Sequence, residues 1–172
     1  TIHDFGGFPQ ALFDVQYPAP GSPELAKETK ELITKTKVGL DHNRGLDHGT
    51  WSVVKHLYPN AEIPVIQLSL DYGKTPQYHY ELAKELSSLR KKGVLIIGSG
   101  NMVHNLGEVD WRKPNSGYGW AERANEIFKE LIINNEHQQL IDYNKLSKEI
   151  TLSIPTPEHY LPLLYILGQK QE

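Results

Sequence analysis

Hydrophobic residues follow two different spacings along the chain. Short runs rich in β-branched residues and leucine are typical of buried strands, and they lie between longer stretches with apolar residues at helical spacing. This pattern predicts strands at 38–40, 63–70 and 94–97. It predicts helices at 23–37, 50–57, 76–92, 119–134, 136–147 and 157–167.

Capping residues mark the ends of two predicted helices. Ser22 stands directly before Pro23, which fits an N-cap followed by proline at the first helical position. Thr75 and Pro76 repeat this arrangement, and Gly93 follows the second helix where a C-terminal glycine is expected. The helix boundaries at 23, 76 and 92 therefore rest on local chemistry as well as on spacing.

The alternation of strands and helices predicts the fold class. Such a pattern favours an α/β domain with a central, largely parallel sheet flanked by helices. Residues 1–21 show neither spacing and are predicted to form a structured loop. With no internal repeat or linker, we expect one catalytic domain over residues 1–172.

Composition and charge exclude several classes of protein. The 18 basic and 21 acidic residues give a net charge of −3, which does not favour nucleic acid as a partner. There is no cysteine, so disulfides, thiolate metal sites and a cysteine nucleophile are excluded. No apolar run approaches the ~20 residues of a membrane-spanning helix, and we expect a cytoplasmic protein without a membrane partner.

Because the chain opens in a loop at Thr1, without Met, we also expect a fragment that is incomplete at both ends.

Three polar segments at predicted loops each contain one histidine. These are His48 in 46–49, His104 in 98–105 and His159 in 155–160. Ligands of open α/β sheets bind beyond the carboxyl ends of the strands, and histidine is suited to proton transfer and metal binding near neutral pH.

Simpler interpretations of these segments stay open. A single loop histidine is often a surface residue or a local hydrogen-bond partner. Asp47 and His48 fit a helix-capping pair, and Glu158 fits an acid placed near a helix N-terminus. Gly98 and Gly100 fit ordinary turn chemistry.

Several common catalytic motifs are absent from this sequence. The stretch from Gly98 lacks the third glycine of a dinucleotide fingerprint and the Gly-Lys-Ser/Thr of a phosphate-binding loop. Ser99 lacks the spacing of the Gly-x-Ser-x-Gly elbow, and His-Glu-x-x-His does not occur. The residues alone thus indicate an α/β enzyme, with metal dependence as one option.

Five sequence blocks in one order carry a resemblance to a known family. They are Thr-Ile-His-Asp-Phe-Gly-Gly-Phe-Pro-Gln at 1–10, Tyr-Pro-Ala-Pro-Gly-Ser-Pro at 17–23, Leu-Asp-His-Gly-Thr-Trp at 46–51, Gly-Ser-Gly-Asn-Met-Val-His-Asn-Leu at 98–106 and Pro-Thr-Pro-Glu-His-Tyr-Leu-Pro-Leu-Leu-Tyr at 155–165. Together they resemble the class III extradiol ring-cleaving dioxygenases, in particular the 4,5-DOPA dioxygenase branch.

The resemblance implies a fold and a metal site. The fold would be like that of the extradiol dioxygenase B subunit. The metal would be non-haem Fe(II), with Zn(II) possible in the same site, and its ligands would include His159 and His104. Two further family ligands, in a His-Gly-Ser-Pro block and a Ser-Ala-His-Trp block, lie upstream of the residues present here.

The resemblance also implies an activity and roles for further residues. A catechol would be opened by O₂ to a muconic semialdehyde, with His104 as acid/base and His48 in contact with substrate or oxygen. Phe5, Phe8 and Tyr160 are predicted to bind the substrate ring. Two alternatives are a non-catalytic metal- or ligand-binding protein on the same fold and a zinc-dependent hydrolase.

Overall fold

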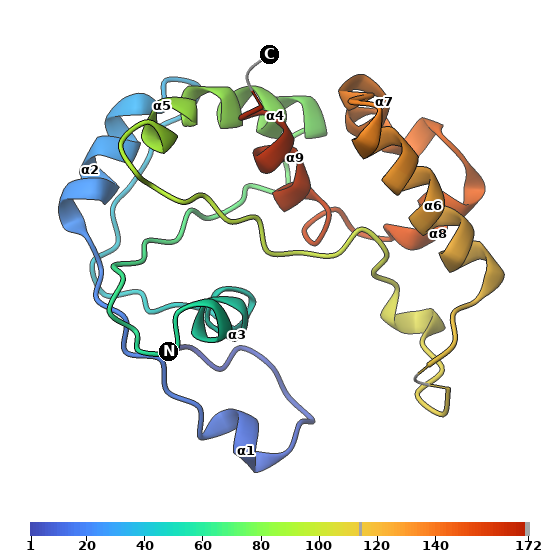
Figure 1. Ribbon diagram of the computed structural model, residues 1–172, viewed down its shortest axis with the longest axis horizontal. Coiled ribbons are helices and arrows are strands. Elements are labelled where there is room, and N and C mark those ends of the chain that lie inside the picture. The colour runs from blue at the N-terminus through green and yellow to red at the C-terminus, as the bar shows by residue number, and fades with distance from the viewer. Residues whose placement is uncertain (114, 171–172) are drawn as a thin grey trace. The chain divides into compact units, whose positions relative to one another are not determined.

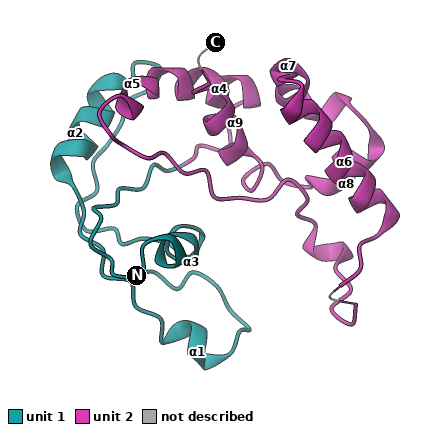
Figure 2. Cartoon of the chain, viewed as in Figure 1, with its two compact units in different colours: residues 1–69 teal, residues 70–172 magenta. Residues whose placement is uncertain are grey.

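The chain folds into two compact units. The computed structural model describes residues 1–113 and 115–170, and the units are Thr1–Ser69 and Leu70–Glu172 (Figure 2). The prediction of one domain over residues 1–172 stays a prediction.

The predicted sheet is wrong, because the described residues form helices and connecting segments without any strand (Figure 1). Segments 38–40, 63–70 and 94–97 contain no regular secondary structure. A strand needs a neighbour that accepts and donates a ladder of backbone hydrogen bonds. In 63–70 the backbone N–H of Val65 instead makes an isolated bond to the Pro20 carbonyl at 2.8 Å. The composition of these segments is typical of strands, but no neighbouring strand pairs with them in the described part of the chain.

The first unit contains three helices. They are α1 (Gln10–Phe13), α2 (Pro23–Leu32) and α3 (His48–Leu57). The start of α2 is as predicted, since the Ser22 hydroxyl accepts a hydrogen bond from the Leu25 N–H at 3.2 Å. The helix ends before the predicted residue 37, because Ile33 is already extended (ψ 112°). Ile33 also begins a stretch with further β-branched residues, which lose side-chain freedom in helices.

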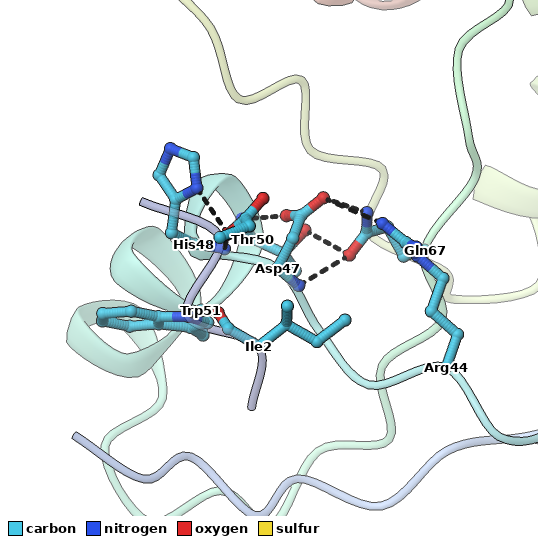
Figure 3. A network of polar contacts seen from close by, with 8 residues as sticks. Ile2, Arg44, Asp47, His48, Thr50, Trp51 and Gln67 are labelled. Atoms are coloured by element: carbon cyan, nitrogen blue, oxygen red, sulfur yellow. Dashed lines mark hydrogen bonds and ion pairs between the residues drawn. The ribbon is translucent and has the colours of Figure 1, made fainter. Parts of the chain in front are cut away.

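The core of the first unit forms around α3. Trp51 and Val54 are buried with Tyr17 and Ala61. The Trp51 indole N–H donates to the Ile2 carbonyl at 2.8 Å, as Figure 3 shows. This bond fastens the N-terminal segment to α3.

The described part of the second unit contains six α-helices and two short 3₁₀ helices. They are α4 (Pro76–Glu85), α5 (Ser87–Arg90), η1 (Leu106–Glu108), α6 (Gly119–Ile133), α7 (His137–Ile141), η2 (Tyr143–Lys145), α8 (Lys148–Ser153) and α9 (Leu161–Leu167). Thr75 caps α4 as predicted, and Gly93 has the positive φ of 80° that favours glycine. The predicted helix 76–92 is divided at Leu86, and 136–147 becomes α7 followed by the single turn η2.

Helix pairs enclose the core of the second unit. Helix α4 packs against α9, and α6 packs against α8 and α7. Phe128, Leu140, Ile150, Leu161 and Leu164 are fully buried between these helices. The longest helix, α6, has 15 residues, and none of the helices in the described ranges is long and apolar enough to cross a membrane.

Gly98 and Gly100 allow their segment to lie directly against residues 159–162 in the second unit. A Cβ on Gly98 would approach the Pro162 carbonyl oxygen to 2.6 Å, and one on Gly100 would overlap the His159 carbonyl oxygen. Neither glycine has a positive φ, so they are needed for close approach and not for turn conformation. Directly after Gly100, the Asn101 N–H donates to the His159 carbonyl at 2.8 Å.

The same segment makes two more contacts further along. The His104 N–H donates to the Ser153 carbonyl at 2.8 Å, and the Asn105 side-chain amide donates to the Leu152 carbonyl at 2.9 Å. Segment 98–105 is therefore fastened at several points to the end of α8 and the approach to α9.

A buried histidine joins α4 to α9. His79 is fully buried, donates from Nε2 to the Asp71 carbonyl (3.0 Å) and accepts at Nδ1 from the Tyr165 hydroxyl (3.1 Å). Burial lowers the pKa of His79 and raises the pKa of Tyr165 to about 12. Both groups are therefore held neutral at physiological pH.

We expect stability to fall on mild acidification because of His79. Its folded pKa lies below the unfolded value of about 6.5, so its contribution is complete above that pH and is lost as the pH falls toward the folded pKa. Urea unfolding between pH 7.5 and 5 measures this slope. His79→Leu should lower the free energy of unfolding throughout and flatten its pH dependence.

The comparison of variants isolates His79. Burial also lowers the pKa values of His104 and His137, so these add to the slope in wild type and variant alike. The control is His56→Gln, on the exposed part of α3, which should leave the slope unchanged. Parallel pH curves for wild type and His79→Leu would contradict the expectation.

Gly100→Ala should destabilise the second unit, because its methyl group has no room beside the His159 carbonyl. Inserting such a group into a packed contact costs about 1–3 kcal/mol, measurable by urea unfolding. Gly119→Ala is the matched control, since nothing lies within 4 Å of a Cβ at that position, the first residue of α6. Equal stability of the two variants would refute the close-approach argument.

Candidate functional site

His104 and His159 lie against each other in the second unit. Their ring centroids are 3.6 Å apart and their planes differ by 14°. His104 and His159 are far apart in the sequence. The backbone hydrogen bonds that join segment 98–105 to His159 and to the end of α8 bring the two rings together. The structure thus brings together two of the three predicted histidines.

The electrostatics of this pair favour neutral imidazole at His104. Burial lowers the pKa of His104, and the neighbouring His159 lowers it further, because two adjacent positive charges repel each other. Neutral imidazole is the form that accepts a proton or binds a metal ion.

Glu158 orients the second ring of the pair. Its Oε1 accepts a hydrogen bond from His159 Nδ1 at 3.2 Å and another from the Thr156 hydroxyl at 2.7 Å. Burial alone would raise the pKa of Glu158, but these hydrogen bonds outweigh burial and lower it. With its proton on Nδ1, neutral His159 presents Nε2 as an acceptor. The sequence offered Glu158 only as an acid near a helix N-terminus, and it gave no signal for Thr156.

The imidazoles of His104 and His159 are suitable ligands for a metal ion, but they are fewer than such a site needs. Imidazole nitrogens suit iron and zinc, and a non-haem iron site wants three protein ligands. No group of three histidine, cysteine, aspartate or glutamate side chains in the described ranges is arranged to hold an ion. His104 and His159 supply two such side chains, and their predicted role as metal ligands stays a prediction.

The predicted role of Tyr160 in binding a substrate ring is not supported. Tyr160 is fully buried, and its hydroxyl donates to the Leu140 carbonyl at 2.7 Å. Its ring packs beside Phe128 and Tyr143, with centroids 5.5 and 4.7 Å away. Burial raises its pKa far above the ordinary value, so Tyr160 is a neutral core residue.

His48, the third predicted histidine, lies in the first unit as the first residue of α3. Its Nδ1 is 2.7 Å from Asp4 Oδ1, and the same oxygen accepts its backbone N–H at 3.1 Å. Asp4 was not predicted, although it stands directly before Phe5 in the first of the five sequence blocks.

A side-chain network fixes the start of α3. The Asp47 carboxylate accepts the Thr50 N–H at 3.0 Å, which confirms the capping interpretation of Asp47. The Gln67 side-chain amide donates to the other Asp47 oxygen, and its carbonyl accepts from the Thr50 hydroxyl at 2.9 Å (Figure 3). These contacts hold the helix end that carries His48.

His48 lies at the edge of a cluster of aromatic rings centred on Phe5. The Phe5 ring lies edge-on to His48 with centroids 5.7 Å apart, and Phe13 and Phe8 lie 4.9 and 5.5 Å from Phe5. Phe8 is 52% exposed. Substrate binding by Phe5 and Phe8 stays a prediction.

Comparison with known proteins identifies relatives along the whole chain. Residues 1–172 match the family described as the catalytic LigB subunit of aromatic ring-opening dioxygenase. A protein of Escherichia coli K12 named 4,5-DOPA dioxygenase extradiol is 50% identical over 98% of this chain and 63% of its own length. A protein of the same name from Mirabilis jalapa is 37% identical, with the same two coverages.

A solved structure agrees with these matches. The crystal structure of the uncharacterized protein JW3007 from Escherichia coli K12 superposes with a TM-score of 0.80 at 44% identity. It covers 92% of this chain, which covers 66% of it. The chain thus spans less than two thirds of the length of the named relatives. It belongs to the LigB family, the catalytic subunits of aromatic ring-opening dioxygenases.

Proposed function

We propose that the protein opens a catechol ring with O₂ at the bond next to the two hydroxyls, as an extradiol dioxygenase. The observation that carries the proposal is the stacked pair His104–His159, in a chain that matches the dioxygenase family from end to end. Both oxygen atoms of O₂ enter the product, a muconic semialdehyde, so the reaction needs no further reductant.

The metal site of the proposal uses His159 and His104. Dioxygenases of this family are metal-dependent, and the two imidazoles have the chemistry to serve as ligands of Fe(II), with Zn(II) as the alternative. When bound, the ion supplies coordination for the catechol oxygens and for O₂. Glu158 holds the Nδ1 proton of His159, which leaves Nε2 to bind. The remaining ligands would come from outside the residues present here.

As the alternative to binding the metal, His104 is proposed as the base for the substrate, because a neutral imidazole has one free ring nitrogen and cannot coordinate an ion and accept a proton at once. Its lowered pKa keeps the ring neutral at physiological pH, so a ring nitrogen is available to take the proton of a catechol hydroxyl. The backbone bond to Ser153 and the packing against His159 hold the ring in place, which reduces the reorganisation needed when the proton moves.

The substrate class follows from the relatives. Several of them are named 4,5-DOPA dioxygenase extradiol, so we propose a DOPA-like catechol for this protein. Phe5 and Phe8 would contact the ring, and His48 would hydrogen-bond substrate or oxygen as charge develops.

The activity is tested in the natural full-length protein. After anaerobic loading with Fe(II), addition of DOPA and O₂ should consume oxygen and produce the yellow absorbance of a semialdehyde. His104→Ala should reduce kcat by roughly 10²–10⁴ without unfolding the protein. The control His42→Ala, in an exposed loop, should retain wild-type kcat.

The alternatives give different results in the same assay. Hydrolysis supported by Zn(II) without oxygen consumption would indicate a hydrolase. A loaded protein that turns over no catechol would indicate a binding protein. Either result would refute the dioxygenase proposal.

The metal site has its own test. Elemental analysis of the full-length protein should find roughly one metal ion per chain, since one ion serves such a site. His159→Ala should lose most of the metal because it removes a ligand. Glu158→Gln should weaken metal binding by roughly 10–100-fold, because the charged partner of His159 is lost. Full metal content in His159→Ala would remove this residue from the site.

A further inference from the structure

Asp4 makes two hydrogen bonds to a single residue, His48. Its Oδ1 accepts from the ring Nδ1 at 2.7 Å and from the backbone N–H at 3.1 Å. Both donors belong to the first residue of α3, so the carboxylate fixes the ring relative to the helix. With one hydrogen bond the Asp4 carboxylate could rotate, whereas the two bonds together define the direction in which it holds the His48 ring.

The surrounding structure places Asp4 for this contact. The Ile2 N–H donates to the Leu46 carbonyl at 2.7 Å, and the Ile2 carbonyl accepts from the Trp51 indole at 2.8 Å. These bonds join Ile2, two residues before Asp4, to Leu46 just before α3 and to Trp51 in its first turn. The Phe5 ring then packs edge-on against His48.

The stability of the fold explains one part of this arrangement, the bond from the His48 N–H in the first turn of α3, but not the contact with the exposed His48 ring. The side chains of His48 and Asp4 are 48% and 41% exposed, and exposed ion pairs contribute little to folding. The N-cap of α3 is already Asp47, whose carboxylate accepts the Thr50 N–H. Burial would raise the pKa of Asp4, but the hydrogen bonds from His48 outweigh it and lower the pKa. The carboxylate therefore stays charged.

We propose that Asp4 is a positioning residue for His48. It holds the imidazole proton on Nδ1, so that Nε2 is presented as a proton acceptor when the ring is neutral and as a donor once it has accepted a proton. This proposal rests on the proposed function, in which His48 contacts substrate or oxygen. A carboxylate hydrogen-bonded to one ring nitrogen commonly fixes the tautomer and orientation of a working histidine.

The tautomer of His48 tests the proposal directly. Free neutral histidine prefers its proton on Nε2, so a proton on Nδ1 is a specific signature of the Asp4 contact. In the full-length protein with ¹⁵N-labelled histidine, NMR should show His48 protonated on Nδ1. Its signals are assigned by their loss in His48→Gln. Asp4→Ala should move the proton to Nε2, and an unchanged tautomer in this variant would overturn the proposal.

Kinetics of the same variants give the second readout. Asp4→Ala should lower kcat for the catechol by roughly 10–100-fold with a smaller effect on KM. Asp4→Asn retains an acceptor for the His48 backbone N–H but lacks the charge, so its kcat should lie between those of wild type and Asp4→Ala. The control Asp14→Ala removes an exposed carboxylate that contacts Gln10, and it should behave as wild type.

The two readouts separate this proposal from the proposed function. If the wild type opens no catechol, the proposed function fails, and the tautomer of His48 still decides whether Asp4 positions the ring. If the wild type is active and Asp4→Ala retains full kcat, Asp4 does not act through His48 and this proposal fails alone.

Discussion

The candidate site of the second unit depends on close contact between two backbone segments. Gly100 lets segment 98–105 lie directly against His159, and the Asn101 N–H donates to the His159 carbonyl there. A few residues later, the His104 N–H donates to Ser153. The backbone thus sets the positions of the two histidines, and their 3.6 Å ring separation is a consequence.

Each unit places a carboxylate against Nδ1 of a predicted functional histidine. Asp4 does so for His48 in the first unit, and Glu158 does so for His159 in the second. In both cases the pKa of the carboxyl group is lowered, so the partner of the ring is charged. In each unit the carboxylate therefore sets which nitrogen of the neutral ring carries the proton.

The starts of α2 and α4 could be predicted because their cause is local, whereas α3 begins at His48 and not at the predicted residue 50. Ser22, Asp47 and Thr75 each cap the helix that follows, through a backbone N–H three residues away. The three candidate histidines could also be found, since polar segments with one histidine stand out from the apolar pattern. Asp4 was missed because its contact spans 44 residues, and no spacing rule connects it to His48.

The sheet prediction failed for a related reason. The composition of 63–70 and 94–97 reports a preference for extended backbone, whereas a strand exists only when a second segment lies beside it. Tyr160 shows the same limit for side chains. Its place in the block at 155–165 suggested a substrate contact, but packing against Phe128 and Tyr143 puts it in the core.

The amino-acid sequence by itself determined the caps, most helical segments and the three histidines, because these follow from each residue and its near neighbours. The tertiary structure alone decided that His104 meets His159, that two glycines serve close approach, and that Asp4 and Glu158 orient imidazole rings. Most of these depend on distances between residues far apart in the chain, and even the neighbouring Glu158 reaches His159 only in one folded geometry. Such distances are set by the packing of the whole unit and not by local preference.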